Sequence, residues 1–412
     1  MLNPYRELFT VPGTKGFALA GLLARTPLPM TGIGIITMLS QLRGSYALAG
    51  VVSATFVLTY ALLSPQTSRL VDRHGQGRVL PIATAVSAIG MLLLLTSTWW
   101  QAPDWSLFIG ALLAGFMPSI SAMVRARWTA IYRGQPRLQT AYSLETVLDE
   151  VTFIAAPPLA IGLSVAVFPQ AGPLAAALFL IIGVFALVTQ RGTEPPVEAQ
   201  DVSTDRSGSV IKQTNVRLLA LLLVAMGVIV GTVDIVSVAF AEQHGQPAAA
   251  SLVLSAYAVG SCLAGLVFGA LKLRTALHQL LLLGGLATAA TTLPLLLVGS
   301  IPTLAAAVLI AGLFFAPTMI VAMSLVERLV PEHRLTEGMT WLLAGLNVGV
   351  ALGAAVSGHV VDEGGARAGF AVALGAGVLV LLVALWGYQR FRAHASFPCC
   401  LTVKPLVPPI KD

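Results

Sequence analysis

Three acidic residues interrupt an apolar stretch in the first half of the chain. Glu145, Asp149 and Glu150 lie within AYSLETVLDEVTFIAAPPLA, residues 141–160. A carboxylate in apolar surroundings needs a charged partner or a proton, so such groups are candidates for binding and releasing protons. Glu145 and Asp149 are four residues apart and share one helix face, whereas Glu150 points about 100° away. The two faces can therefore serve different chemistry.

The composition indicates that lipid, rather than water, surrounds much of the chain that contains these acids. Of 412 residues, 56% are hydrophobic and only 10% are charged, whereas soluble domains carry about 25% charged residues. Lipid must therefore surround much of the chain. The net charge of +6 is spread over short loops, so we expect no nucleic acid partner. The three cysteines match neither a disulfide framework nor a metal site, and we expect no metal, no cofactor and no enzymatic activity.

Long apolar runs predict an all-α membrane protein with twelve transmembrane helices, because a bilayer core about 30 Å thick requires about 20 apolar residues per helix. The predicted spans are 17–41, 45–66, 79–99, 105–124, 140–163, 173–190, 216–240, 249–271, 276–298, 302–325, 337–360 and 368–389. A polar linker at 191–215 would separate two six-helix halves, residues 1–190 and 216–390. Residues 391–412 would form a tail.

The basic residues predict the orientation. With the N-terminus inside, the inner loops and tails hold 21 Lys and Arg residues and the outer loops hold two, Arg43 and Arg367. This asymmetry favours cytoplasmic termini and an even number of spans. We expect a multi-pass monomer in the lipid bilayer of a bacterial cytoplasmic membrane.

Arg25 is the one Lys or Arg residue deep inside a predicted span. It lies about 13 Å along its helix, and Asp149 and Glu150 lie about 14–15 Å along theirs from the same side. This shared depth predicts an ion pair between Arg25 and either Asp149 or Glu150. A second acid without a full partner could then bind a proton near neutral pH. A static pair without proton transfer is the alternative. Glu145 is near enough to the inner surface to extend its side chain toward water.

Other polar residues and prolines fall within the spans. Asp234 lies far along the seventh span, where we expect a charge at the outer rim or gate. The proline pairs that we expect to bend the first and fifth spans are Pro27, Pro29, Pro157 and Pro158.

The two halves carry weakly similar sequences. Residues 136–150 align with 333–347, which places Glu150 opposite Asn347. Asn347 could bind substrate or join two helices. Internal repeats joined by a linker are typical of secondary transporters, in which substrate binds between the repeats.

The loop after the second span, SRLVDRHGQGRV, resembles a motif of the major facilitator superfamily. The positions that fit the family pattern are Asp72, Arg73, Gly75 and Arg78. The resemblance implies a cytoplasmic gate in which the aspartate faces the start of the eleventh helix, near Thr336. Asp72 and Arg73 could instead be solvated loop charges. Signatures of drug–proton antiporters are incomplete, because alanines replace glycines in 156–161 and no Arg lies between Trp105 and Val124.

The combined pattern predicts a secondary active transporter that exports a small, drug-like or amphipathic compound in exchange for protons by alternating access. An uptake carrier for a small metabolite, by symport or facilitated diffusion, is the alternative within transport. A non-transporting membrane sensor or scaffold is the alternative of another class. No phosphate-binding glycine loop is present, which argues against ATP as the energy source.

Overall fold

A computed structural model describes residues 3–395 except 45, 198–208, 247–248 and 272–274. Much of the predicted linker and most of the predicted tail lie outside these residues. So do five of the basic residues assigned to the inner side: Arg206, Lys272, Arg274, Lys404 and Lys411.

The described chain consists of helices, and it contains no strand within these ranges. The α-helices are α1 (Asn3–Leu8), α2 (Thr14–Arg25), α3 (Pro27–Arg43), α4 (Tyr46–His74), α5 (Gln76–Trp99), α6 (Trp105–Ala114), α7 (Ile120–Tyr132), α8 (Arg137–Ala166), α9 (Ala171–Val188), α10 (Thr214–Gln243), α11 (Ala249–Ala270), α12 (Leu277–Ala290), α13 (Ile301–Leu329) and α14 (Leu335–Ala395). Short 3₁₀ turns are η1 (Arg191–Thr193), η2 (Val210–Lys212), η3 (Pro294–Leu297) and η4 (Glu332–Arg334).

The predicted membrane architecture is confirmed. Eleven segments of the described chain are long and apolar enough to cross a membrane, and α6 is a shorter apolar helix. α2 and α3 together form one span, Thr14–Arg43. α14 contains the span Glu363–Arg392 and most of the span Glu332–Val361, and Gly365 near the start of the later span has a φ of 77° and a ψ of 172°, which are not helical.

The fourth span differs from the prediction. It was expected to run continuously over 105–124, but residues 115–119 break it into α6 and α7. Pro118 lies in this break and has no N–H to donate to a helix. α7 also continues to Tyr132, so Arg125 and Arg127 are buried in the protein rather than placed in a loop.

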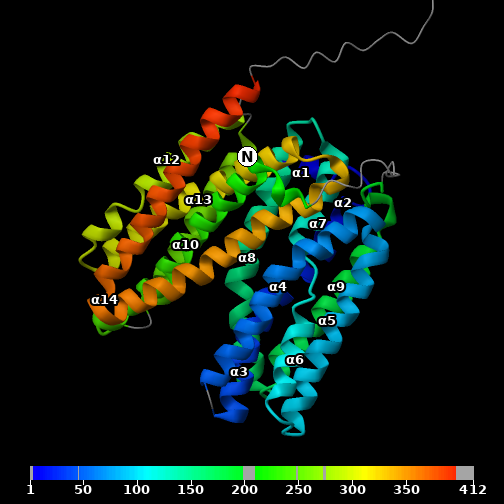
Figure 1. Ribbon diagram of the computed structural model, residues 1–412, viewed down its shortest axis with the longest axis vertical. Helices are drawn as coiled ribbons and strands as arrows, with labels where there is room; N and C mark the ends of the chain where they lie inside the picture. The colour runs from blue at the N-terminus through cyan, green and yellow to red at the C-terminus, as the bar shows by residue number, and fades with distance from the viewer. Residues whose placement is uncertain (1–2, 45, 198–208, 247–248, 272–274, 396–412) are drawn as a thin grey trace, which may run out of the picture.

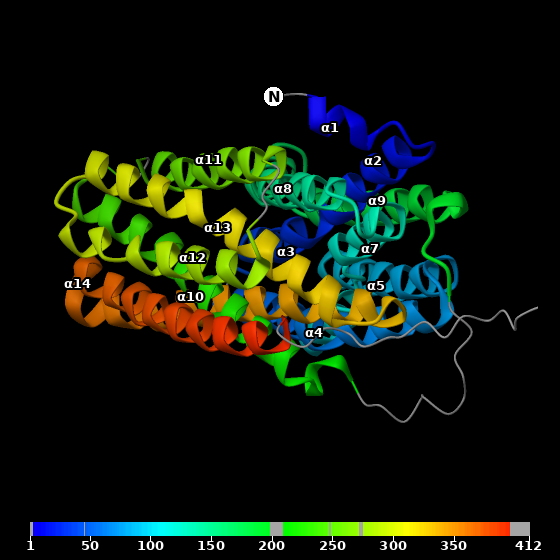
Figure 2. The same cartoon turned by 90° about the horizontal axis from the view of Figure 1, so that it is seen from above.

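The helices form two bundles that lie side by side (Figures 1 and 2). α2–α9 make up the first bundle and α10–α14 the second. Large apolar side chains such as Leu62 and Leu382 are exposed on their outer surfaces, as expected for contact with lipid. The second view shows the two halves of the chain meeting chiefly through α4, α7, α8, α11, α13 and α14.

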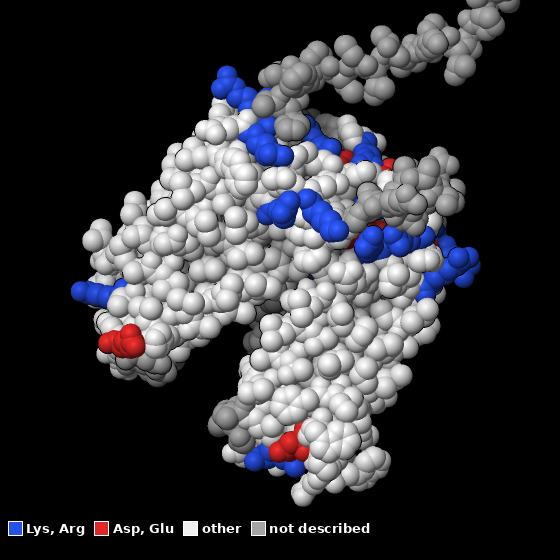
Figure 3. Space-filling view, viewed as in Figure 1, with Lys and Arg blue, Asp and Glu red and all other residues white. Residues whose placement is uncertain are grey.

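The two bundles touch at one end, which we call the closed end. There Arg133 forms ion pairs with Glu332 at 2.6 Å and Glu327 at 3.2 Å. The Thr140 hydroxyl donates to the Gly269 carbonyl at 2.6 Å. At the other, open end the bundles diverge, and a notch separates them in the space-filling view (Figures 1 and 3). Most of the visible Lys and Arg residues gather at the closed end (Figure 3).

Glycines allow α10 and the first span of α14 to pack in direct backbone contact. A methyl group on Gly349 would lie 2.1 Å from the Val224 carbonyl oxygen, and one on Gly353 would lie 2.3 Å from that of Val228. Such approach is a common basis of helix association in lipid. This glycine stripe therefore stabilises the interior of the second bundle and does not lie between the bundles.

Gly349→Ala should destabilise the protein, because its methyl group has no space against α10. We expect a cost of about 1–3 kcal/mol, typical of overpacking, measured as a lower midpoint of thermal unfolding in detergent. Gly375→Ala is the matched control in the same element, since no heavy atom lies within 4 Å of its added methyl group. Equal midpoints for the two variants would contradict the close packing of α10 on α14.

Candidate functional site

Arg25 lies at the end of α2, immediately before the proline-containing start of α3. Its side chain is only 4% exposed. The guanidinium donates to a carboxylate oxygen of Glu145 and, at 2.7 Å, to Oδ1 of Asp149. Its Nε also donates to the Gly21 carbonyl at 3.2 Å. The expected contact between Arg25 and Asp149 is present, and Glu145 rather than Glu150 is the second partner.

Glu145 does not extend toward water. Its side chain is fully buried, and its second oxygen accepts a hydrogen bond from Trp128 Nε1 at 2.8 Å. The expectation of a solvated Glu145 was wrong, because Arg25 and Trp128 of neighbouring helices cover that face of α8. Glu145 and Asp149 thus use their shared helix face to bind one guanidinium.

Arg125 is a member of the site that the sequence did not reveal. It is fully buried on α7, and its Nη2 lies 2.8 Å from Asp149 Oδ2, an ion pair that lacks the alignment of a hydrogen bond. The Ser121 hydroxyl, one turn earlier, donates to Asp149 Oδ1 at 2.6 Å. The signal available was the spacing of Ser121, Arg125 and Thr129 on one helix face. Arg125 was instead grouped with loop residues because it follows directly on an apolar run.

Two guanidinium groups and two carboxylates therefore balance within the first bundle. We call Arg25, Arg125, Glu145 and Asp149 the charge cluster. All four are brought together by α2, α7 and α8. An unpaired ion inside a membrane is costly, and mutual pairing removes most of that cost. The cluster leaves no acid or base of its own unneutralised.

Glu150 points out of the first bundle toward α11 of the second. The Ser261 hydroxyl donates to its Oε1 at 3.1 Å. No cation partner of Glu150 is found among the described residues. The third acid of α8 thus lies apart from the charge cluster and contacts the opposite bundle.

Small residues bring α8 and α11 together between the closed end and Glu150. A methyl group on Gly269 would lie 2.3 Å from Ser143 Cβ, and one on Gly265 would lie 3.1 Å from Val147 Cγ2. Ser261 is the next residue of this stripe toward the open end. Glu150 therefore contacts α11 farther along this line than the two glycines do.

The remaining predicted site residues are more scattered. Asp234 on α10 is partly buried and its charge acts on Glu150, and its role as a charge at the outer rim or gate stays a prediction. Asn347 on α14 is partly buried. α8 stays helical through Pro157 and Pro158, whereas α2 gives way to α3 at Thr26, just before Pro27 and Pro29.

At the closed end, Asp72 faces the start of α14 as the motif resemblance implies. Its carboxylate accepts hydrogen bonds from the backbone N–H of Thr336 at 3.2 Å and of Glu337 at 2.8 Å. The positive end of a helix dipole favours an anion at this position. Gly75 adopts a φ of 85° before α5, Arg73 is partly buried and Arg78 is exposed.

A pocket adjoins the charge cluster on the first bundle. Its lining includes Arg25, Asp149, Ser121, Tyr60 and Phe153.

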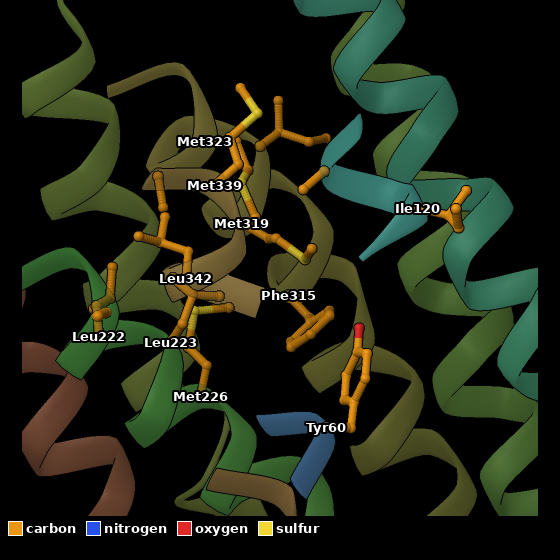
Figure 4. Packing of buried hydrophobic residues seen from close by; sticks show 14 of the residues in the cluster. Tyr60, Ile120, Leu222, Leu223, Met226, Phe315, Met319, Met323, Met339 and Leu342 are labelled. Atoms are coloured by element: carbon orange, nitrogen blue, oxygen red, sulfur yellow. The ribbon is translucent and has the colours of Figure 1, made fainter. Parts of the chain in front are cut away.

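Residues of the second bundle lie near Tyr60, one of the residues that line this pocket. In the close view, Tyr60 lies near Phe315 of α13, and Met319 and Met323 follow along that helix (Figure 4). Within the described ranges, no group of three His, Cys, Asp or Glu residues could hold a metal ion. The site combines a few charges with a large apolar surface, a composition suited to a small organic ligand.

Removing Arg25 should leave Glu145 as an unpaired buried anion, because Trp128 supplies only a neutral hydrogen bond. We expect Arg25→Met to cost about 3–5 kcal/mol of stability. The double variant Arg25→Met/Glu145→Gln should be more stable than this single variant, since the uncompensated charge is gone.

Thermal unfolding in detergent measures both effects. Arg137→Met is the control, because its ion pair with Glu7 is about half exposed and should contribute less than about 1 kcal/mol. A single Arg25→Met variant as stable as this control would show that the charge cluster is not a paired, dry site.

Similarity to known proteins agrees with this geometry. The chain matches the Major Facilitator Superfamily over residues 17–245 and again over 218–397. Among curated proteins, none matches the chain.

Solved structures share its fold. A bacterial homologue of the iron transporter ferroportin, in an outward-facing state, superposes with a TM-score of 0.75 at 16% identity, covering 92% of this chain and 100% of that one. The human organic anion transporter MFSD10 gives 0.70 at 15%, covering 91% and 100%. The E. coli fucose:proton symporter gives 0.66 at 14%, covering 90% and 98%. With two matched repeats and this architecture, the chain belongs to the Major Facilitator Superfamily.

Proposed function

We propose that the protein is a proton-coupled exporter of a small amphipathic compound in a bacterial cytoplasmic membrane. Membership of a family of transporters and a pocket beside the charge cluster support transport. The direction, the coupling ion and the residue that carries it are the further steps argued below.

Alternating access is supported by the asymmetry between the two ends. Contacts such as Arg133–Glu332 and Asp72–Glu337 join the bundles at the closed end, and a notch separates them at the open end. The excess of Lys and Arg at the closed end supports a cytoplasmic position for that end. On this assignment, the conformation is one that admits solutes and protons from outside.

The single observation that carries the proton coupling is the position of Glu150. Glu145 and Asp149 are neutralised by Arg25 and Arg125, whereas among the described residues Glu150 has only the Ser261 hydroxyl as a hydrogen-bond partner and no cation. It also lies on the inter-bundle line, where access changes as the bundles rock. Glu150 is therefore the acid best placed to take a proton from one side and release it on the other.

A physical constraint then links proton and substrate. Between its two open forms, the carrier must pass through a form in which the site is closed to both sides. A bare carboxylate in such a dry site costs several kcal/mol. The cost disappears when the carboxylate binds either a proton or a substrate that compensates its charge. It remains when the site is empty and the carboxylate is ionised. Exchange of one for the other follows, and the inward proton gradient of a bacterial membrane drives export.

Flux in proteoliposomes with an imposed pH gradient tests this proposal, using a panel of charged and neutral amphipathic compounds. The wild-type protein should accumulate at least one compound against its gradient. At compound concentrations high enough to saturate a weakened site, Glu150→Gln should keep exchange of labelled for unlabelled compound but lose gradient-driven accumulation by more than tenfold, because its amide cannot carry a proton.

Glu363→Gln is the matched control, since this carboxylate is 71% exposed at the open end of the second bundle. Gradient-driven accumulation by Glu150→Gln would contradict the role of Glu150. Accumulation in the same direction as proton flow would favour symport over antiport. The absence of any flux in the wild-type protein would favour a sensor or scaffold.

A further inference from the structure

The charges between the two bundles do not balance. Arg25 and Arg125 are matched by Glu145 and Asp149 within the charge cluster. Two acids remain outside it, Glu150 from α8 and Asp234 from α10. Their charges act on each other, and no basic residue of the described chain pairs with either of them. The inter-bundle space therefore carries an excess of negative charge when both are ionised.

Asp234 is the stronger indication of a missing partner. It is partly buried, and the described chain supplies it with neither a hydrogen bond nor an ion pair. A buried carboxylate in this situation requires a cation or a proton to be stable. Asp234 and Glu150 come from opposite bundles, so a cation between them would bind both halves of the carrier at once.

Aromatic side chains lie beside these two acids. Tyr257 of α11 is one turn from Ser261, the residue that binds Glu150, and the charges of Glu150 and Asp234 both act on it. The ring of Tyr257 packs on that of Phe315 with 6.0 Å between centroids and 56° between planes. Aromatic faces attract organic cations, most strongly where water is excluded.

The wall next to this aromatic pair is apolar and adaptable. Met319 and Met323 follow Phe315 along α13, and Met226 of α10 lies across from them (Figure 4). Flexible, polarisable thioethers adjust to ligands of different shape. This surface suits the hydrocarbon body of a ligand whose charge lies at the two acids.

We propose that Glu150, Asp234, Tyr257 and Phe315 form a binding site for a lipophilic organic cation. The inference deepens the proposed function, on which it rests, by naming the substrate class. The cation would neutralise the two carboxylates, with its apolar body against Phe315 and Met319. An anionic substrate fits less well, because both guanidinium groups of the site already bind carboxylates.

Equilibrium binding to the purified full-length protein in detergent tests this assignment with two probes of nearly equal shape and opposite charge. Tetraphenylphosphonium is a cation and tetraphenylborate is an anion. We expect saturable binding of the cation at least tenfold tighter than that of the anion. Asp234→Asn and Glu150→Gln should each weaken cation binding at least tenfold, whereas Glu363→Gln should leave it unchanged.

Two further variants separate binding from misfolding. Asp234→Glu keeps the charge and should retain cation binding, and Tyr257→Leu should weaken it by removing the aromatic face. Tetraphenylphosphonium has no titratable proton, so any pH dependence of its binding comes from the protein. Affinity should fall as the pH is lowered and Glu150 and Asp234 take up protons, and this dependence should be smaller in Glu150→Gln. The other groups near Glu150 are Asp149, Tyr257 and Cys262.

The assignment is overturned if tetraphenylborate binds as tightly as tetraphenylphosphonium, or if both acid variants bind the cation as the wild type does. These outcomes are distinct from failure of the transport proposal. Cation binding that depends on both acids, without gradient-driven flux, would retain this site and refute the exporter. Gradient-driven flux of other compounds without cation binding would retain the exporter and refute this site.

Discussion

Pairing of buried charges is the constraint on which this structure depends. Lipid and a dry protein interior both oppose an isolated ion, so every charge inside the bundles needs a partner or a proton. Arg25 and Arg125 meet this requirement with Glu145 and Asp149, and they join α2, α7 and α8 in doing so. The charge cluster does not neutralise Glu150 and Asp234. These are the two acids at which we expect a mobile proton or a ligand to bind.

The fold places one of these two acids, Glu150, where the two bundles meet. Gly269 and Gly265 let α11 approach α8 near the closed end, and Glu150 contacts Ser261 farther along the same line. A group at such a point is covered or uncovered by any rocking of one bundle against the other. Asp72 at the start of α14 stabilises the closed end of the same arrangement. Packing, gating and the proposed proton exchange thus share a few helix faces.

The sequence predicted the spans and the Arg25–Asp149 contact because apolar length and depth along a helix can be read directly. It missed Arg125, since an arginine that ends an apolar run looks the same whether water or protein surrounds it. Glu145 was misjudged for a related reason: α8 alone does not reveal that Trp128 covers it. The electrostatic effect of Asp234 on Glu150 depends on how the two halves pack, and this packing cannot be predicted from either segment alone.

The central claim is that Glu150 gains and loses a proton while the charge cluster keeps its charges. Infrared difference spectroscopy across neutral pH measures this directly, because a protonated carboxyl group has its own C=O band. The spectrum of the wild type minus that of Glu150→Gln should contain one such band, which grows as the pH falls, whereas Glu363→Gln should match the wild type. Identical carboxyl bands in the wild type and Glu150→Gln would contradict the account.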